Sequence, residues 1–210
     1  MFPNYGDSFD VRRPSAHDAG MHRTAIVALG SNVGDRLAHL RSAAAAVRAL
    51  PGVRAFRASR LYETPALTLS GVGALGGRDA FLNAAIAFET NADPHGLLHD
   101  LLSIEKRHGR LPRSQRPTWG PRPIDLDLLT FGDVQIDDTT LTLPHPRIAE
   151  RWFVLAPMAD LVPEARLRVD DSTEGWATVQ ERLAWMVADA DDPSGLGRVY
   201  ADASWSPPVL

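Results

Sequence analysis

Residues 119–129 read WGPRPIDLDLL, and apolar and acidic residues alternate strictly from Ile124 to Leu128. A period of two predicts a β-strand with one buried face. Asp125 and Asp127 then share the other face, with Cα atoms roughly 6.5–7 Å apart, since a strand rises about 3.3 Å per residue. Two carboxylates this close repel each other, so the pattern predicts a cation beside them. Mg²⁺ fits best, because it binds one or two carboxylates and completes its shell with water and phosphate oxygens.

A run of basic residues lies just before the acidic pair: Arg107, His108, Arg110, Arg113, Arg116 and Arg122. Carboxylates for a metal beside clustered arginines suit a polyphosphate ligand. Lys106 is the only lysine of the chain, and no glycine precedes it. A Walker A loop and the strand lysine of a protein kinase are therefore excluded. If the chain handles ATP, arginines and magnesium must hold the phosphates.

Composition limits the class of protein. The 210 residues suit one domain with extensions, and we expect a disordered leader at 1–22, a folded domain at 23–188 and a tail at 189–210. Met21 could be the true start. The net charge of −4 argues against nucleic acid or an anionic membrane as partner, and the chain has no cysteine. Without a membrane-length apolar run or a signal peptide, we expect a cytoplasmic protein.

The order of predicted elements is β-α-β-β-α-β. A buried strand at 24–29 leads through the turn GSNVGD into a helix that Asp35 could cap. That turn is either a phosphate-binding loop or a tight turn that needs glycine. Strand-like residues at 53–63 and 81–89 follow, and Asp93-Pro94 predicts the start of a second helix. A hairpin after Gly132 completes an α+β fold, an antiparallel sheet with helices packed on it. One further amphipathic helix is predicted at 176–187.

Several single residues are candidates for ligand contact. Phe81 and Asn83 share one face of their strand, where a planar ligand could meet a ring and an amide, although Phe81 could equally belong to a second apolar layer. His145 stands between two prolines, either as a rigid phosphate contact or simply as part of a turn. Glu105 could contact a ligand or be a solvated helix acid. His95 and His99 have the i,i+4 spacing of a zinc pair, but no third ligand is evident.

Taken together, the segments ALGSNVGDR, LYETPA, FLNAA, IEKRHGR, WGPRPIDLDLL, LPHPR and ERWFVLAPMADLVPE occur in an order that resembles one family. It is the family of 6-hydroxymethyl-7,8-dihydropterin pyrophosphokinases, which transfer pyrophosphate from ATP to a pterin alcohol in folate biosynthesis. The resemblance runs from about Thr24 to Glu164. The WGPR-x-IDLD segment is highly specific, whereas GSN and PHP are individually weak.

The resemblance implies a ferredoxin-like core, two Mg²⁺ ions with ATP, and a role for each matching residue. The magnesium ligands match Asp125 and Asp127, and the arginines that position and stabilise the transferred group match Arg110 and Arg122. Arg122, His145 and Arg151 match residues that contact the ATP phosphates. The nearby acid Glu105 and the loop arginines Arg113 and Arg116 are further candidates for ATP contact. Residues matching the pterin contacts are Thr64, Ala66, Phe81, Asn83, Trp119 and Phe153. In this pattern the GSN turn is not the main triphosphate site.

Two loops depart from the family pattern, at 64–81 and between Arg110 and Trp119, and leave open which of Arg113 and Arg116 contacts phosphate. Two other classes of protein remain as alternatives. A ferredoxin-like RNA-binding module would have a basic sheet face and no need for paired acids. A magnesium-dependent nucleotide phosphohydrolase would use the same carboxylates on water. We expect a monomer with ATP and the pterin alcohol as its ligands, and no nucleic acid or membrane partner.

Overall fold

A six-stranded antiparallel sheet forms the centre of the computed structural model, which describes residues 21–65, 67–68, 71–72, 80–111, 122–169, 175–190, 196–202 and 205. Its strands are β1 (Arg23–Ser31), β2 (Arg54–Ala58), β3 (Leu61–Thr64), β6 (Phe81–Thr90), β7 (Asp125–Phe131) and β12 (Arg198–Tyr200). The order across the sheet is β12-β3-β6-β1-β7, and β2 also pairs with β6. The segment predicted as one irregular strand at 53–63 is thus two short strands, and both pair with the long strand β6.

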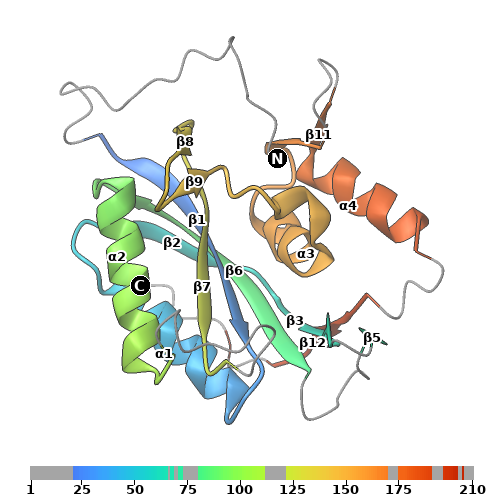
Figure 1. Cartoon of the computed structure of the whole chain (residues 1–210), viewed down its shortest axis with the longest axis horizontal. Helices are drawn as coiled ribbons and strands as arrows, with labels where there is room; N and C mark the ends of the chain where they lie inside the picture. The colour runs from blue at the N-terminus through green and yellow to red at the C-terminus, as the bar shows by residue number, and fades with distance from the viewer. Residues whose placement is uncertain are drawn as a thin grey trace.

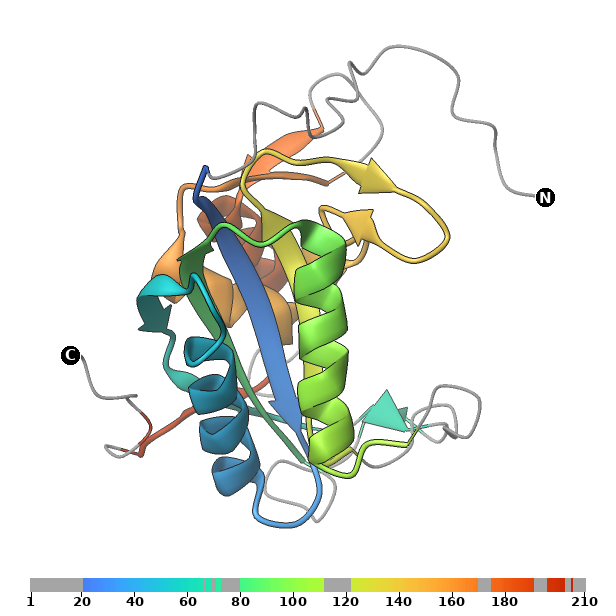
Figure 2. The same cartoon turned by 90° about the vertical axis from the view of Figure 1, so that its left-hand side faces the viewer.

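Helices cover both faces of this sheet. α1 (Arg36–Arg48) and α2 (Pro94–Arg107) lie on one face, and α3 (Trp152–Leu161) and α4 (Val179–Ala188) lie on the other (Figures 1 and 2). Both predicted helix starts are confirmed, because Asp35 accepts a hydrogen bond from the Ala38 N–H and Asp93 accepts one from the Gly96 N–H. Such side-chain acceptors satisfy backbone donors that the first helical turn leaves without partners.

Successive side chains of β6 point to opposite faces of the sheet, and each face belongs to a different apolar core. Leu82, Ile86 and Phe88 belong to the core with α1 and α2. Ala85 and Ala87 face the other way and pack with residues of α3 and α4. Because both faces of β6 are covered, almost all of its residues are buried. The acidic strand β7 alternates as predicted, with Leu126 and Leu128 in the first core.

Short elements extend this frame. They are the hairpins β4 (Leu67–Thr68) with β5 (Gly71–Val72), β8 (Ile136–Asp137) with β9 (Thr142–Leu143) and β10 (Arg166–Arg168) with β11 (Trp176–Thr178), together with the 3-10 turn η3 (Ile148–Glu150). The predicted helix at 176–187 begins three residues late, at Val179. Its first residues pair with β10 as strand β11, and Thr178 and Glu181 form a capping box that fixes the helix start.

The C-terminal residues contribute to the sheet. Strand β12 pairs with β3, so β3 is not an edge strand. Trp205 is only 5% exposed, and its indole N–H donates to the Ser59 carbonyl at 2.7 Å. The sequence predicts a tail at 189–210, whereas these contacts tie part of that segment to the sheet. Of the leader predicted at 1–22, residues 1–20 are outside the described part. Among the described residues, no helix has the length and apolar character needed to cross a membrane.

Candidate active site

The sheet register brings the two groups of predicted site residues together. Gly30 of β1 lies opposite Asn83 of β6 on one side and opposite Asp125 of β7 on the other. A Cβ atom placed on Gly30 would lie 3.3 Å from Asn83 Oδ1, 3.8 Å from Phe81 Cδ1 and 3.9 Å from Asp125 Cβ. Two of the residues predicted to bind the pterin, Phe81 and Asn83, therefore adjoin the predicted magnesium ligand Asp125 across a single glycine, although Asn83 and Asp125 are 42 residues apart in sequence.

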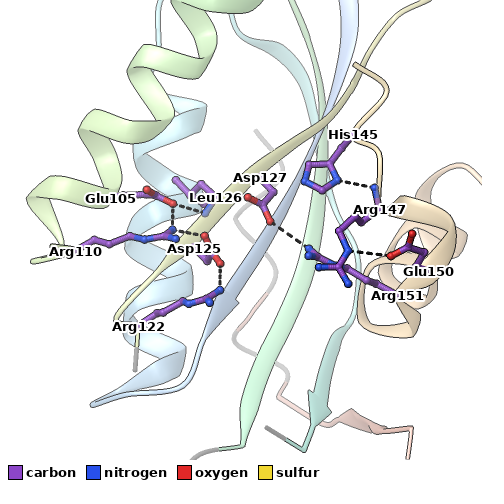
Figure 3. A network of polar contacts seen from close by, with 10 residues as sticks. All are labelled: Glu105, Arg110, Arg122, Asp125, Leu126, Asp127, His145, Arg147, Glu150 and Arg151. Carbon is purple, nitrogen blue, oxygen red and sulfur yellow. Dashed lines mark hydrogen bonds and ion pairs between the residues drawn. The ribbon is translucent and has the colours of Figure 1, made fainter. Parts of the chain in front are cut away.

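Two arginines hold Asp125. Arg110, which follows α2, contacts Asp125 Oδ1, and Arg122 Nη1 donates to Asp125 Oδ2 at 2.5 Å (Figure 3). Burial by itself would raise the pKa of Asp125, but the charges and hydrogen bonds of Arg110 and Arg122 outweigh burial and lower it. The Nε atom of Arg110 is buried and has no hydrogen-bond partner among the described residues. Arg110 thus retains a donor for an acceptor such as a phosphate oxygen.

Glu105, on α2, contacts this cluster through Arg110, and its position differs from the predicted contact with ATP. Its side chain is buried, Oε1 accepts from the Leu126 N–H at 2.8 Å, and the same oxygen contacts Arg110 (Figure 3). A carboxylate in this position connects α2 to β7 and orients a guanidinium group. We therefore assign Glu105 to holding Arg110, since a buried acid facing the sheet is poorly placed to meet a nucleotide.

Asp127 is more accessible than its partner acid. Its side chain is 39% exposed, and Oδ2 lies 3.9 Å from Arg151 Nη1 (Figure 3). Partial burial, together with the negative charge of Asp125, raises the pKa of Asp127 to about 6. A cation bound by both acids would offset that repulsion. The two predicted metal ligands thus lie on one face of β7, beside three arginines.

His145 and Arg151 form the far side of the site. The backbone N–H of His145 donates to the Leu129 carbonyl at 2.8 Å, which ties the PHP turn to β7. His145 Nδ1 accepts from the Arg147 N–H at 3.2 Å, so Nε2 carries the proton of the neutral ring and can donate to a ligand. Burial and then the charge of Arg151 lower the pKa of His145. The Arg151 guanidinium lies 5.7 Å from the centre of the Phe153 ring.

The predicted pterin residues are placed in part. Asn83 Nδ2 donates to Thr64 Oγ1 at 2.8 Å, and both side chains are buried. This bond fixes the amide so that its carbonyl oxygen faces Gly30. Phe81 and Phe153 are both partly exposed, on β6 and at the start of α3, and their stacking on one ring stays a prediction. Ala66, Arg113, Arg116 and Trp119 are outside the described residues.

Asn32, in the GSN turn, has a role that the sequence did not suggest. Its Oδ1 accepts from the Arg122 N–H at 2.7 Å, and its own N–H donates to the Arg122 carbonyl at 3.1 Å. The turn therefore fixes the backbone of Arg122. The one feature of the sequence that could have indicated this role is the position of the asparagine directly after a buried strand. The alternative of a zinc pair gains no support, because His95 pairs with Asp138 at 2.9 Å and the described part holds no cluster of three metal-binding side chains.

Comparison with known proteins identifies this arrangement. An α+β sheet with a carboxylate pair among arginines fits the class of enzymes that act on polyphosphates. The family model for 7,8-dihydro-6-hydroxymethylpterin-pyrophosphokinase (HPPK) matches residues 26–163, and the chain belongs to this family. A pyrophosphokinase from Methylorubrum extorquens is 42% identical over 83% of this chain and 98% of its own length. One from Bacillus subtilis is 38% identical over 67% of this chain and 79% of its own. The predicted family, with its reaction in folate biosynthesis, is thereby confirmed.

Longer relatives and solved structures agree on the fold. The bifunctional folate-synthesis protein of Pisum sativum is 43% identical over 67% of this chain, which corresponds to 25% of that protein. A crystal structure of Plasmodium falciparum HPPK-DHPS matches with a TM-score of 0.60 and 14% identity over 85% of this chain. The chain spans 47% of that protein's length. The predicted α+β, ferredoxin-like fold is confirmed by this similarity.

Proposed function

We propose that this chain transfers pyrophosphate from ATP to 6-hydroxymethyl-7,8-dihydropterin with the residues gathered around Gly30. The hydroxymethyl oxygen attacks the β-phosphorus, the bond to the α-phosphate bridging oxygen breaks, and AMP leaves as the pterin diphosphate forms. The observation that carries the proposal is the row Asn83-Gly30-Asp125, because it joins an amide that can read a pterin to a carboxylate that can bind magnesium.

The pterin is assigned to the side of Gly30 that carries Asn83. A pterin is a flat ring with hydrogen-bonding amide-like edges, which suits an oriented side-chain amide flanked by aromatic rings. Asn83 has a fixed orientation because Thr64 accepts from it. We assign Phe81 and Phe153 to the ring faces, and Thr64 and Ala66 to backbone contacts. Trp119 would close over the bound substrates.

The phosphates are assigned to the arginine side. Arg110 and Arg122 supply guanidinium groups, and His145 and Arg151 contribute further donors across β7. In this proposal Arg110 and Arg122 move from Asp125 onto phosphate oxygens when ATP binds, because one guanidinium donor set cannot serve both anions fully. Arg113 and Arg116 remain additional candidates in the same loop.

Asp125 and Asp127 fit magnesium. They supply carboxylate oxygens, the ligands that Mg²⁺ prefers, and the described residues offer no larger cluster of acids, which leaves room for water and phosphate oxygens. When bound there, magnesium with ATP would neutralise and orient the phosphates. Among the described residues, the site presents no evident side chain as general base. Positioning of the alcohol and stabilisation of the developing charge by arginines would therefore supply most of the rate enhancement.

Product analysis tests the proposal. Purified protein is mixed with ATP, Mg²⁺ and the reduced pterin alcohol, and nucleotides and pterins are separated by chromatography. AMP should appear in a one-to-one ratio with a pterin diphosphate, and only when the pterin is present. Nucleotide hydrolysis that is independent of pterin would favour the phosphohydrolase instead. The monomeric state and cytoplasmic location remain predictions, for size-exclusion chromatography and cell fractionation to test.

A further inference from the structure

The C-terminal strand β12 lies against the residues that orient Asn83. Arg198 pairs with Glu63 in the β12–β3 register, and the antiparallel pairing continues from there to Tyr200 and Leu61. Arg198 Nη2 donates to Glu63 Oε2 at 2.6 Å, and Arg198 Nε donates to the same oxygen at 3.1 Å. The Glu63 side chain is only 2% exposed, so the acidic partner of this ion pair is buried while Arg198 reaches it from the surface. Arg36 completes it from α1, with Nη2 at 3.0 Å from Glu63 Oε1.

The backbone of Gly197 packs so closely against its neighbours that no side chain fits there. A Cβ atom on this residue would lie 2.6 Å from Trp152 Cζ3, 2.8 Å from the Glu63 carbonyl oxygen and 2.8 Å from Thr64 Cγ2. Its φ of 151° also favours glycine. No side chain fits between these three atoms without displacing at least one of them. Gly197 therefore packs directly on Thr64, whose hydroxyl accepts from Asn83.

Two contacts beyond β12 keep this segment in place. Asp202 pairs with Arg41 of α1 at 3.3 Å, and the buried Trp205 donates to the Ser59 carbonyl at 2.7 Å. All of these contacts follow Gly197 in sequence, so the segment is fixed to the domain on the C-terminal side of the Thr64 contact. It also lies beyond residues 26–163, which the family model matches.

We propose that Gly197 and Arg198 are positioning residues for pterin recognition: they hold the end of β3 so that Thr64 orients the Asn83 amide. This inference rests on the proposed pterin site. Neither residue touches the reacting atoms in this scheme. Gly197 packs on Thr64, and Arg198 binds the neighbouring Glu63, on the side of Gly30 where Asn83 lies. Disturbing these contacts should therefore weaken pterin binding and leave ATP binding unchanged.

Steady-state kinetics with ATP, Mg²⁺ and the reduced pterin alcohol test this inference. Gly197→Ala should raise the KM for pterin by about tenfold or more, while the KM for ATP and kcat stay within about twofold of wild type. Arg198→Ala should raise the pterin KM by a smaller factor, and Arg198→Lys should restore it partly because a cation again faces Glu63. Val199→Ala is the matched control, since Val199 lies on the same strand and is 49% exposed.

If Gly197→Ala does not fold, the Arg198→Ala and Arg198→Lys pair decides the question. A pterin KM within twofold of wild type in the folded variants would overturn the inference, and so would equal rises in the KM for pterin and for ATP. Asn83→Ala separates this failure from that of the proposed function. If Asn83→Ala raises the pterin KM and the C-terminal variants do not, only the inference fails. If Asn83→Ala leaves that KM unchanged, the proposed pterin site fails and the inference fails with it.

Discussion

Gly30→Ala should separate stability from substrate binding. The backbone of Gly30 is in a conformation open to other residues, since its φ is not among the positive values of the chain. Alanine in the interior of a strand is favoured over glycine by roughly 0.5–1 kcal/mol, because glycine loses more conformational entropy on folding. This gain offsets the cost of crowding Asn83 Oδ1, which would lie 3.3 Å from the new Cβ atom, so the melting temperature should change little.

The added methyl group, in contrast, enters the site. Its distance of 3.3 Å to Asn83 Oδ1 is tighter than an ordinary contact, whereas its distance of 3.9 Å to Asp125 Cβ is ordinary. The amide has little freedom to move, because Thr64 holds its nitrogen at 2.8 Å. A displaced amide that leaves one buried hydrogen bond to the pterin unmade costs about 1–3 kcal/mol. Pterin affinity should then fall by roughly 5- to 150-fold, with ATP affinity nearly unchanged.

Isothermal titration calorimetry measures this effect. The pterin alcohol is titrated into wild type and Gly30→Ala with Mg²⁺ and a non-hydrolysable ATP analogue present, and the analogue is titrated separately. Thermal unfolding of both proteins verifies that the variant is folded. A pterin Kd within twofold of wild type in a folded variant would refute the reasoning, because the methyl group would then lie away from the ligand. An equal loss of affinity for the ATP analogue would also contradict it.

Three further predictions concern single side chains. Asp127→Ala should lower kcat by about 100- to 1,000-fold, the usual cost of removing one electrostatic group from a site, and leave pterin binding intact in calorimetry. Asp189→Ala, at the exposed acid directly after α4, is the control and should be active. Asn83→Ala should weaken pterin binding by roughly 5- to 150-fold, and unchanged affinity would remove its assignment. Burial alone would raise the pKa of Glu63, but hydrogen bonds and charge from Arg198 and Arg36 outweigh burial and lower it. The stabilisation from a lowered pKa is present above the ordinary value of 4.5 and is lost as pH falls through the folded-state pKa, so the melting temperatures of wild type and Glu63→Gln should differ most near pH 7 and converge toward pH 3. A difference that grows in acid would contradict the assigned charge state.

Local sequence patterns predicted much of this fold. The alternation of apolar and polar residues predicted β6 and β7, and Asp35 and Asp93 predicted two helix starts. Strand faces and helix caps depend only on residues close to each other in sequence. The sequence also predicted the chemistry of the site, because an acidic pair beside clustered arginines suits phosphates and a hard cation. The roles of the individual site residues stay predictions.

Other features lie beyond such patterns. Glu105 looked like a ligand contact on a helix, yet its carboxylate holds Arg110 and the backbone of β7. Strand β12 is only three residues long, and nothing in its sequence indicates that it covers β3. Each of these facts depends on a pairing between distant residues, which sequence spacing does not encode directly.

The sequence alone determined which chemical groups this protein has and which face of each element carries them, since both follow from residue identity and backbone periodicity. The tertiary structure decided which of those groups meet. Registers between β1, β6 and β7 bring Asn83 to one side of Gly30 and Asp125 to the other. A shift of one residue in either register would turn these side chains to the opposite face. That register is selected by the burial of two apolar cores, a property of the whole sheet rather than of any single segment.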